Sequence, residues 1–119
     1  MEIRRMSEIP KEPAAGPLFT GDDVGRQQLA PESNDFNISV VHFGTGIKNK
    51  LHYHESDQIL IVTGGIGVVG TAEGEIKVEE GDVVFAPAGE QHYHGAAPDN
   101  SFAHITVTRK GTGAIQLEE

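Results

Sequence analysis

Apolar and polar side chains alternate with period two between residues 36 and 43, a pattern that is typical of a β-strand. Further short stretches rich in β-forming residues follow, separated by turns that contain glycine or proline. They cover residues 51–54, 58–63, 66–71, 75–79, 83–86, 91–95, 102–108 and 114–117. Gly64-Gly65 has the composition of a hairpin turn between two of them. No stretch favours a helix, so the pattern predicts about seven to nine strands in an all-β sandwich or jelly-roll barrel.

The first 35 residues differ from the rest because prolines at positions 10, 13, 17 and 31 interrupt any periodicity. We expect residues 1–35 to form an extended N-terminal arm, with a short edge strand at 18–20 that could pair with a neighbouring sheet, including one in a partner subunit. Residues 36–119 are then the barrel domain.

The size and charge of the chain narrow its function. A chain of 119 residues is long enough for one domain with one core. The formal net charge of −9 disfavours nucleic acid as a partner. The longest apolar run, residues 59–62, is far shorter than a membrane span, and the N-terminus has no apolar signal core. With no cysteine, a metal site would need nitrogen and oxygen ligands, and we expect a cytoplasmic protein that acts on a small molecule.

Histidines are the main candidates for chemistry. His52 and His54 are two residues apart on an expected strand, so both imidazoles leave the same face and could share one ion. Gln58 has the same parity, and His92 on a later strand offers a further neutral donor. A lone His-x-His pair is more often a surface pair than a metal site, so the pair by itself leaves both interpretations open.

Two spaced motifs frame these residues. The first runs Gly46, five residues, His52-Tyr53-His54, three residues, Gln58, six residues, Gly65, and the second runs Gly81, five residues, Pro87, one residue, Gly89, two residues, His92. Together they resemble the two motifs of the cupin superfamily, over about residues 36–108. The resemblance implies a double-stranded β-helix, or jelly-roll, barrel. It also implies one divalent metal ion, liganded at the positions matched by His52, His54, Gln58 and His92.

The chain departs from the common cupin pattern at two positions, with Gln58 in place of glutamate and Ala96 in place of asparagine. A neutral Gln58 would leave both charges on a divalent ion and strengthen its Lewis acidity. It also removes the carboxylate of the facial triad found in many iron oxygenases. Nitrogen ligands with one amide oxygen do not select a metal sharply, so iron, nickel, zinc and cobalt stay open beside manganese.

Two further histidines are candidates for catalytic residues. His94 shares a face with His92, and His104 has the parity of Thr106 and Thr108, the polar positions of its strand. An imidazole near its usual pKa beside a bound substrate is suited to general base catalysis. The competing interpretation is that both side chains are packed structural histidines. His42 has the opposite parity to Val41 and is expected outside the site.

Residues 58–63, 81–84 and 92–98, together with His104, are similar to the small bacterial manganese-dependent cupin hydroxynitrile lyases. This similarity implies manganese as the cofactor, His104 as the base, and reversible cleavage of a cyanohydrin to an aldehyde and hydrogen cyanide. The alternatives are a metal-dependent dioxygenase or isomerase, and a non-catalytic cupin that binds or senses a small molecule. A lone small barrel leaves edge strands exposed, so we expect a homodimer or a higher homo-oligomer.

Overall fold

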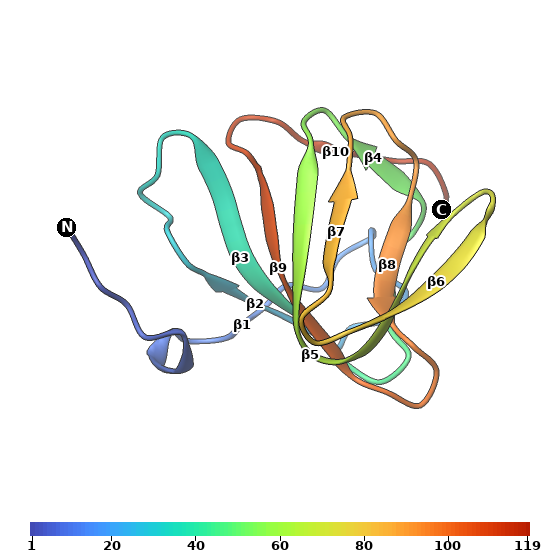
Figure 1. The fold of residues 1–119 in the computed structure, drawn as a ribbon, viewed down its shortest axis with the longest axis horizontal. Coiled ribbons are helices and arrows are strands. Elements are labelled where there is room, and N and C mark those ends of the chain that lie inside the picture. The colour runs from blue at the N-terminus through green and yellow to red at the C-terminus, as the bar shows by residue number, and fades with distance from the viewer.

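The computed structural model describes residues 1–119, which form a barrel of antiparallel strands (Figure 1). One 3-10 turn, η1 (Met6–Glu8), precedes the first strand. The strands are β1 (Glu12–Pro13), β2 (Val24–Gln28), β3 (Phe36–Phe43), β4 (His52–His54), β5 (Gln58–Thr71), β6 (Gly74–Glu79), β7 (Val83–Ala86), β8 (Tyr93–Ala96), β9 (Phe102–Arg109) and β10 (Ala114–Gln116). The expected all-β fold is confirmed, and the strands from β3 onward lie within a few residues of the stretches that the sequence predicts. No helix of the structure is long and apolar enough to cross a membrane.

Two sheets face each other across the interior. The first has the order β1-β2-β3-β9-β5, with β7 on the other side of β5. The second contains β6, β5 and β8. Single backbone bridges join Gly95 of β8 to Lys48, and His92 to His52 of β4, which pairs with β10. Strand β5 belongs to both sheets, because its first half pairs with β7 and β9 and its second half with β6 and β8. This shared strand joins the sheets into a jelly-roll barrel.

Strand β5 also corrects one expectation, because Gly64-Gly65 does not form a hairpin. The strand continues through both glycines, and the register with β9 shifts between Val62 and Gly64. Gly65 has a φ of 73°, and a Cβ there would lie 2.0 Å from the carbonyl oxygen of Ser101. The glycines therefore allow a β-bulge that bends the strand from one sheet into the other.

The interior is divided into an apolar end and a polar end. Phe43 and Phe102 pack together at the apolar end, with their ring centroids 5.9 Å apart, and Val24 and Val62 complete the same cluster. Alternation along β5 buries Gln58 together with Leu60 and Val62. Gln58 therefore points into the polar end of the interior, because it shares the inward-facing side of β5 with Leu60 and Val62.

The N-terminal segment contributes more to the sheet than expected. Its first residues and η1 extend away from the barrel (Figure 1), but β2 pairs with β3 along its whole length. The stretch expected as an edge strand makes only a single bridge, between Phe19 and Asn49. The division of the chain at residue 35 stays a prediction, while β2 adds inward-facing side chains to the barrel.

Candidate metal centre

The site is built on one backbone pair between β4 and the residue before β8. The amide of His52 donates to the carbonyl oxygen of His92 at 3.0 Å, and the amide of His92 donates to that of His52 at 2.9 Å. Residues paired in this way stand directly opposite each other with their side chains on the same face. His54 follows His52 by two residues and therefore shares that face.

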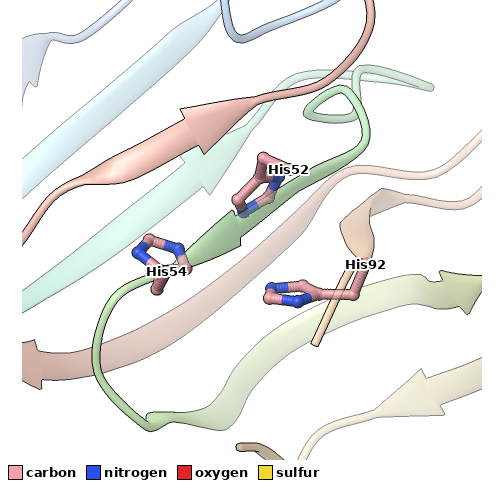
Figure 2. Close-up of side chains that lie close together, drawn as sticks. All are labelled: His52, His54 and His92. Carbon is pink, nitrogen blue, oxygen red and sulfur yellow. The ribbon is translucent and has the colours of Figure 1, made fainter. Parts of the chain in front are cut away.

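Three imidazoles converge as a result (Figure 2). One ring nitrogen from each of His52, His54 and His92 lies within 4.8 Å of the others. The ring centroid of His52 lies 5.0 Å from that of His54 and 4.7 Å from that of His92. His52 and His92 are buried and His54 is half-buried. These three side chains could hold one metal ion.

Backbone carbonyl groups fix the tautomers of two of these rings. Nδ1 of His52 donates to the carbonyl oxygen of Lys50 at 2.6 Å, and Nδ1 of His92 donates to that of Glu90 at 2.8 Å. In a neutral imidazole the other nitrogen then carries a lone pair. Nε2 of His52 is buried and has no hydrogen-bond partner. Such an unpartnered acceptor is costly in a protein interior, and a bound cation would satisfy it.

Gln58 approaches the cluster from the opposite sheet. Its Nε2 donates to Oγ1 of Thr106 at 2.9 Å, which turns Oε1 toward Nε2 of His92, also at 2.9 Å. Because His92 donates through Nδ1, both atoms of this contact present lone pairs. A cation shared by the two atoms would convert the contact from unfavourable to favourable. The donor set of three imidazoles and one amide oxygen therefore fits a divalent transition metal.

Burial favours the neutral form of His52 and His54. Burial, followed by the neighbouring His52 and His92, lowers the pKa of His54 from 6.5 to about 4. Burial also lowers the pKa of His52, although the hydrogen bond to Lys50 opposes this effect. Metals bind the neutral form of histidine, so the lowered pKa values favour metal binding at neutral pH.

His94 and His104 form a second group beside the first. Nδ1 of His94 lies 3.1 Å from Nε2 of His104, and both rings are buried. Asn49 supports His94, because its Oδ1 accepts the His94 backbone N–H at 2.8 Å and its Nδ2 lies 3.2 Å from the ring nitrogen Nε2. His94 has no nitrogen in the three-histidine cluster, although its ring centroid lies 5.7 Å from that of His52.

Burial changes one expectation for His104, because it lowers the pKa of this imidazole to about 4, below the near-physiological value that the sequence suggests. Its Nδ1 is buried and has no hydrogen-bond partner. His104 is therefore neutral at neutral pH. Because Nδ2 of Asn49 donates to Nε2 of His94, the His94 ring donates its Nδ1–H to Nε2 of His104, and the proton of the neutral His104 ring lies on Nδ1.

A cavity of about 400 Å³ opens onto both histidine groups. His52, His54 and Gln58 line its inner end with His94 and His104. The cavity also reaches the inner face of β2, where Arg26 and Gln28 contribute to its wall.

His42 lies outside this cavity, whereas Asn49 and Arg26 line it. His42 lies on the outer face of the first sheet, where its Nε2 is 2.8 Å from Oε1 of Gln27. Asn49 and Arg26 are functional candidates that the sequence does not single out. The alternation of residues 24, 26 and 28 indicates that Arg26 shares a face with buried Val24, but the prolines and glycines around it favour an irregular arm. Asn49 has no signal in the sequence, since only the fold brings it to His94.

Known proteins share this architecture. Residues 39–108 match the family described as the cupin domain. The chain is 31% identical over 115 residues to an (R)-mandelonitrile lyase from Granulicella tundricola, covering 95% of this chain and 88% of that protein.

Two solved structures extend the comparison. A cupin-like protein from Thermotoga maritima superimposes with a TM-score of 0.84 at 28% identity, covering 94% of this chain and 89% of that one. A polyketide cyclase from Streptomyces resistomycificus superimposes with a TM-score of 0.87 at 15% identity, covering 100% and 87%, and shares the fold. With its two-sheet barrel, paired motifs and convergent histidines, the chain belongs to the cupin superfamily.

Proposed function

We propose that this protein binds one divalent metal ion through His52, His54, His92 and Gln58, and that it cleaves cyanohydrins to an aldehyde and hydrogen cyanide. The observation that carries the proposal is the convergence of three imidazoles and one amide oxygen in a cavity that His104 also lines. The 31% identity to a mandelonitrile lyase supports the reaction class.

When bound, a divalent ion supplies Lewis acidity that can polarise a substrate oxygen or accept cyanide. All four proposed ligands are neutral, so this chain would leave the full charge of the ion directed at the substrate. We propose manganese as the ion. The backbone acceptors of Lys50 and Glu90 hold the rings of His52 and His92 in the orientation that directs Nε2 inward.

His104 is the proposed base. Nε2 of its neutral ring, which accepts from Nδ1 of His94 in the free protein, takes the hydroxyl proton of the cyanohydrin as the C–O bond becomes a carbonyl and the carbon–cyanide bond breaks with its electron pair on cyanide. Burial makes the resulting imidazolium acidic, which favours return of the proton to cyanide as hydrogen cyanide. Asn49 fixes the His94 tautomer that donates Nδ1–H to His104, so Nε2 of His104 keeps the basic lone pair.

The test is mandelonitrile cleavage by manganese-loaded protein, followed by benzaldehyde absorbance. We expect turnover above the metal-free background, loss of turnover in His104→Ala by about 100-fold or more, and unchanged metal content in that variant. His42→Ala is the matched control, because it removes an imidazole from the outer face of the same sheet. Equal rates with and without metal would refute the proposal. Oxygen consumption with iron would favour the dioxygenase alternative, and ligand-dependent thermal stabilisation without any product would favour a sensor.

We also propose that a second copy of the chain covers the outer face of the first sheet. Ile59 pairs with Phe85 and Ile61 with Val83 on this face, and all four side chains are exposed. Clustered exposed apolar side chains of this kind are typical of protein interfaces. Sedimentation analysis should give a dimer or a larger oligomer for the wild type and a smaller species for Phe85→Glu. A monomeric wild type would refute this proposal.

A further inference from the structure

The cavity is electropositive in a protein that is strongly acidic. The chain has 18 Asp and Glu against 9 Lys and Arg, yet no Asp or Glu lines the cavity. Arg26 and Lys110 line it instead. The proposed metal ligands are also neutral. The carboxylate nearest to Arg26 in register is Glu12, which is its partner across β1 and β2 but forms no ion pair with it.

Arg26 is one of the two cations that line the cavity, and it is an exposed residue. It sits on β2 opposite Val41, which in turn pairs with His104 on β9, and all three side chains line the cavity. The Arg26 guanidinium makes no hydrogen bond and no ion pair, whereas Arg4 pairs with two glutamates and Lys48 with one. A guanidinium presents parallel N–H donors that match the two oxygens of a carboxylate.

The cross-strand neighbours next to Arg26 on the cavity face of β2, β3 and β9 are also polar. Gln28, Ser39 and Thr106 face each other across β2, β3 and β9, and Asn37 faces Thr108 in the next row. All five side chains line the cavity. Hydroxyl and amide groups on consecutive strands can bind several oxygen atoms of one ligand.

Lys110 has a different role from Arg26. Its Nζ donates to the carbonyl oxygens of Pro31 and Ser33 at 2.8 and 2.7 Å, so it holds the loop before β3 against the rim of the cavity. Most of its hydrogen-bonding capacity is therefore used by the backbone. A single free guanidinium favours a carboxylate, since phosphate sites usually combine several free donors.

We propose that the natural ligand of this cavity is a small hydroxylated carboxylate, with its carboxylate bound by Arg26 and its hydroxyl directed toward the histidines. Arg26 and His104 lie two strands apart, a separation of about 10 Å between their Cα atoms. Both side chains line the same cavity, so one small ligand could contact both of them. This proposal rests on the proposed function for the position of the hydroxyl, while the carboxylate contact depends on Arg26 alone.

The experiment compares mandelate with mandelamide, which replaces the carboxylate by a neutral group of the same shape. Binding is measured by calorimetry on manganese-loaded protein and by NMR titration of metal-free protein. We expect mandelate to bind about tenfold more tightly than mandelamide in the metal-free protein, and Arg26→Gln to remove that preference. Lys77→Gln is the matched control, because Lys77 lies on β6, outside the cavity, and carries the same charge.

The outcomes separate this proposal from the proposed function. Loss of the mandelate preference in Arg26→Gln but not in Lys77→Gln supports it, including when the protein binds no metal. Equal affinity for mandelate and mandelamide in the metal-free wild type overturns it, even if the manganese-loaded protein cleaves mandelonitrile. An equal loss in both variants also overturns it, because a non-specific charge effect would then account for the preference.

Discussion

Acid should destabilise the metal-free protein through its buried histidines, and His104 offers the clearest measurement. Its side chain is fully buried, and burial lowers its pKa from 6.5 to about 4. Between these two values the unfolded chain binds a proton at this position and the folded chain does not. The free energy of unfolding therefore has its full value above pH 6.5 and falls as the pH drops toward 4.

The size of the effect follows from the two pKa values. The difference corresponds to a loss of about 3 kcal/mol at pH 4 and about 2 kcal/mol at pH 5 from this one imidazole. A loss of this size is a large fraction of the stability of a small domain. Other buried histidines, such as His94, add to the total in the same direction.

The assay is urea unfolding at pH 7, 6 and 5 in the presence of a chelator, followed by circular dichroism. Subtracting the results for His104→Gln, which keeps a polar side chain but does not titrate, isolates the contribution of His104. We expect the variant to lose about 2 kcal/mol less than the wild type between pH 7 and pH 5. His42→Gln, at a half-buried position on the outer face, should change the slope much less. Identical slopes for the wild type and His104→Gln would refute the buried neutral imidazole.

Three further predictions test the site and the core. His52→Ala should reduce bound manganese from about one ion per chain to none, measured by elemental analysis, since it removes a buried donor with no other partner. Gln58→Glu should tighten manganese binding by about tenfold or more and slow mandelonitrile cleavage, because a carboxylate neutralises part of the charge of the ion. Phe43→Ala should lower the free energy of unfolding by about 3–5 kcal/mol in urea, since Phe43 packs against Phe102 and other aromatic rings at the centre of the barrel.

Each of these predictions has a result that would contradict it. Stoichiometric manganese in His52→Ala would mean that the metal is bound elsewhere. Unchanged affinity in Gln58→Glu would mean that this side chain does not touch the ion. A loss below about 1 kcal/mol in Phe43→Ala would contradict the close packing of the apolar end of the barrel.

Most of the strands, and the shared face of His52 and His54, can be predicted from the local order of residues. Period-two alternation indicates which side chains share a face, so β3 and β9 could be predicted from local order. Because His52 and His54 are two residues apart on β4, their imidazoles lie on the same side of the strand.

How those faces meet depends on the folded barrel. Alternation does not say which strand lies beside which, because pairing depends on contacts between residues far apart in the chain. Gly64-Gly65 therefore predicts a hairpin but forms a bulge, since a glycine pair allows both conformations. The contact between Gln58 and His92, and the position of Arg26 beside the row of His104, arise because three separate segments close one barrel and bury their polar faces around the same cavity.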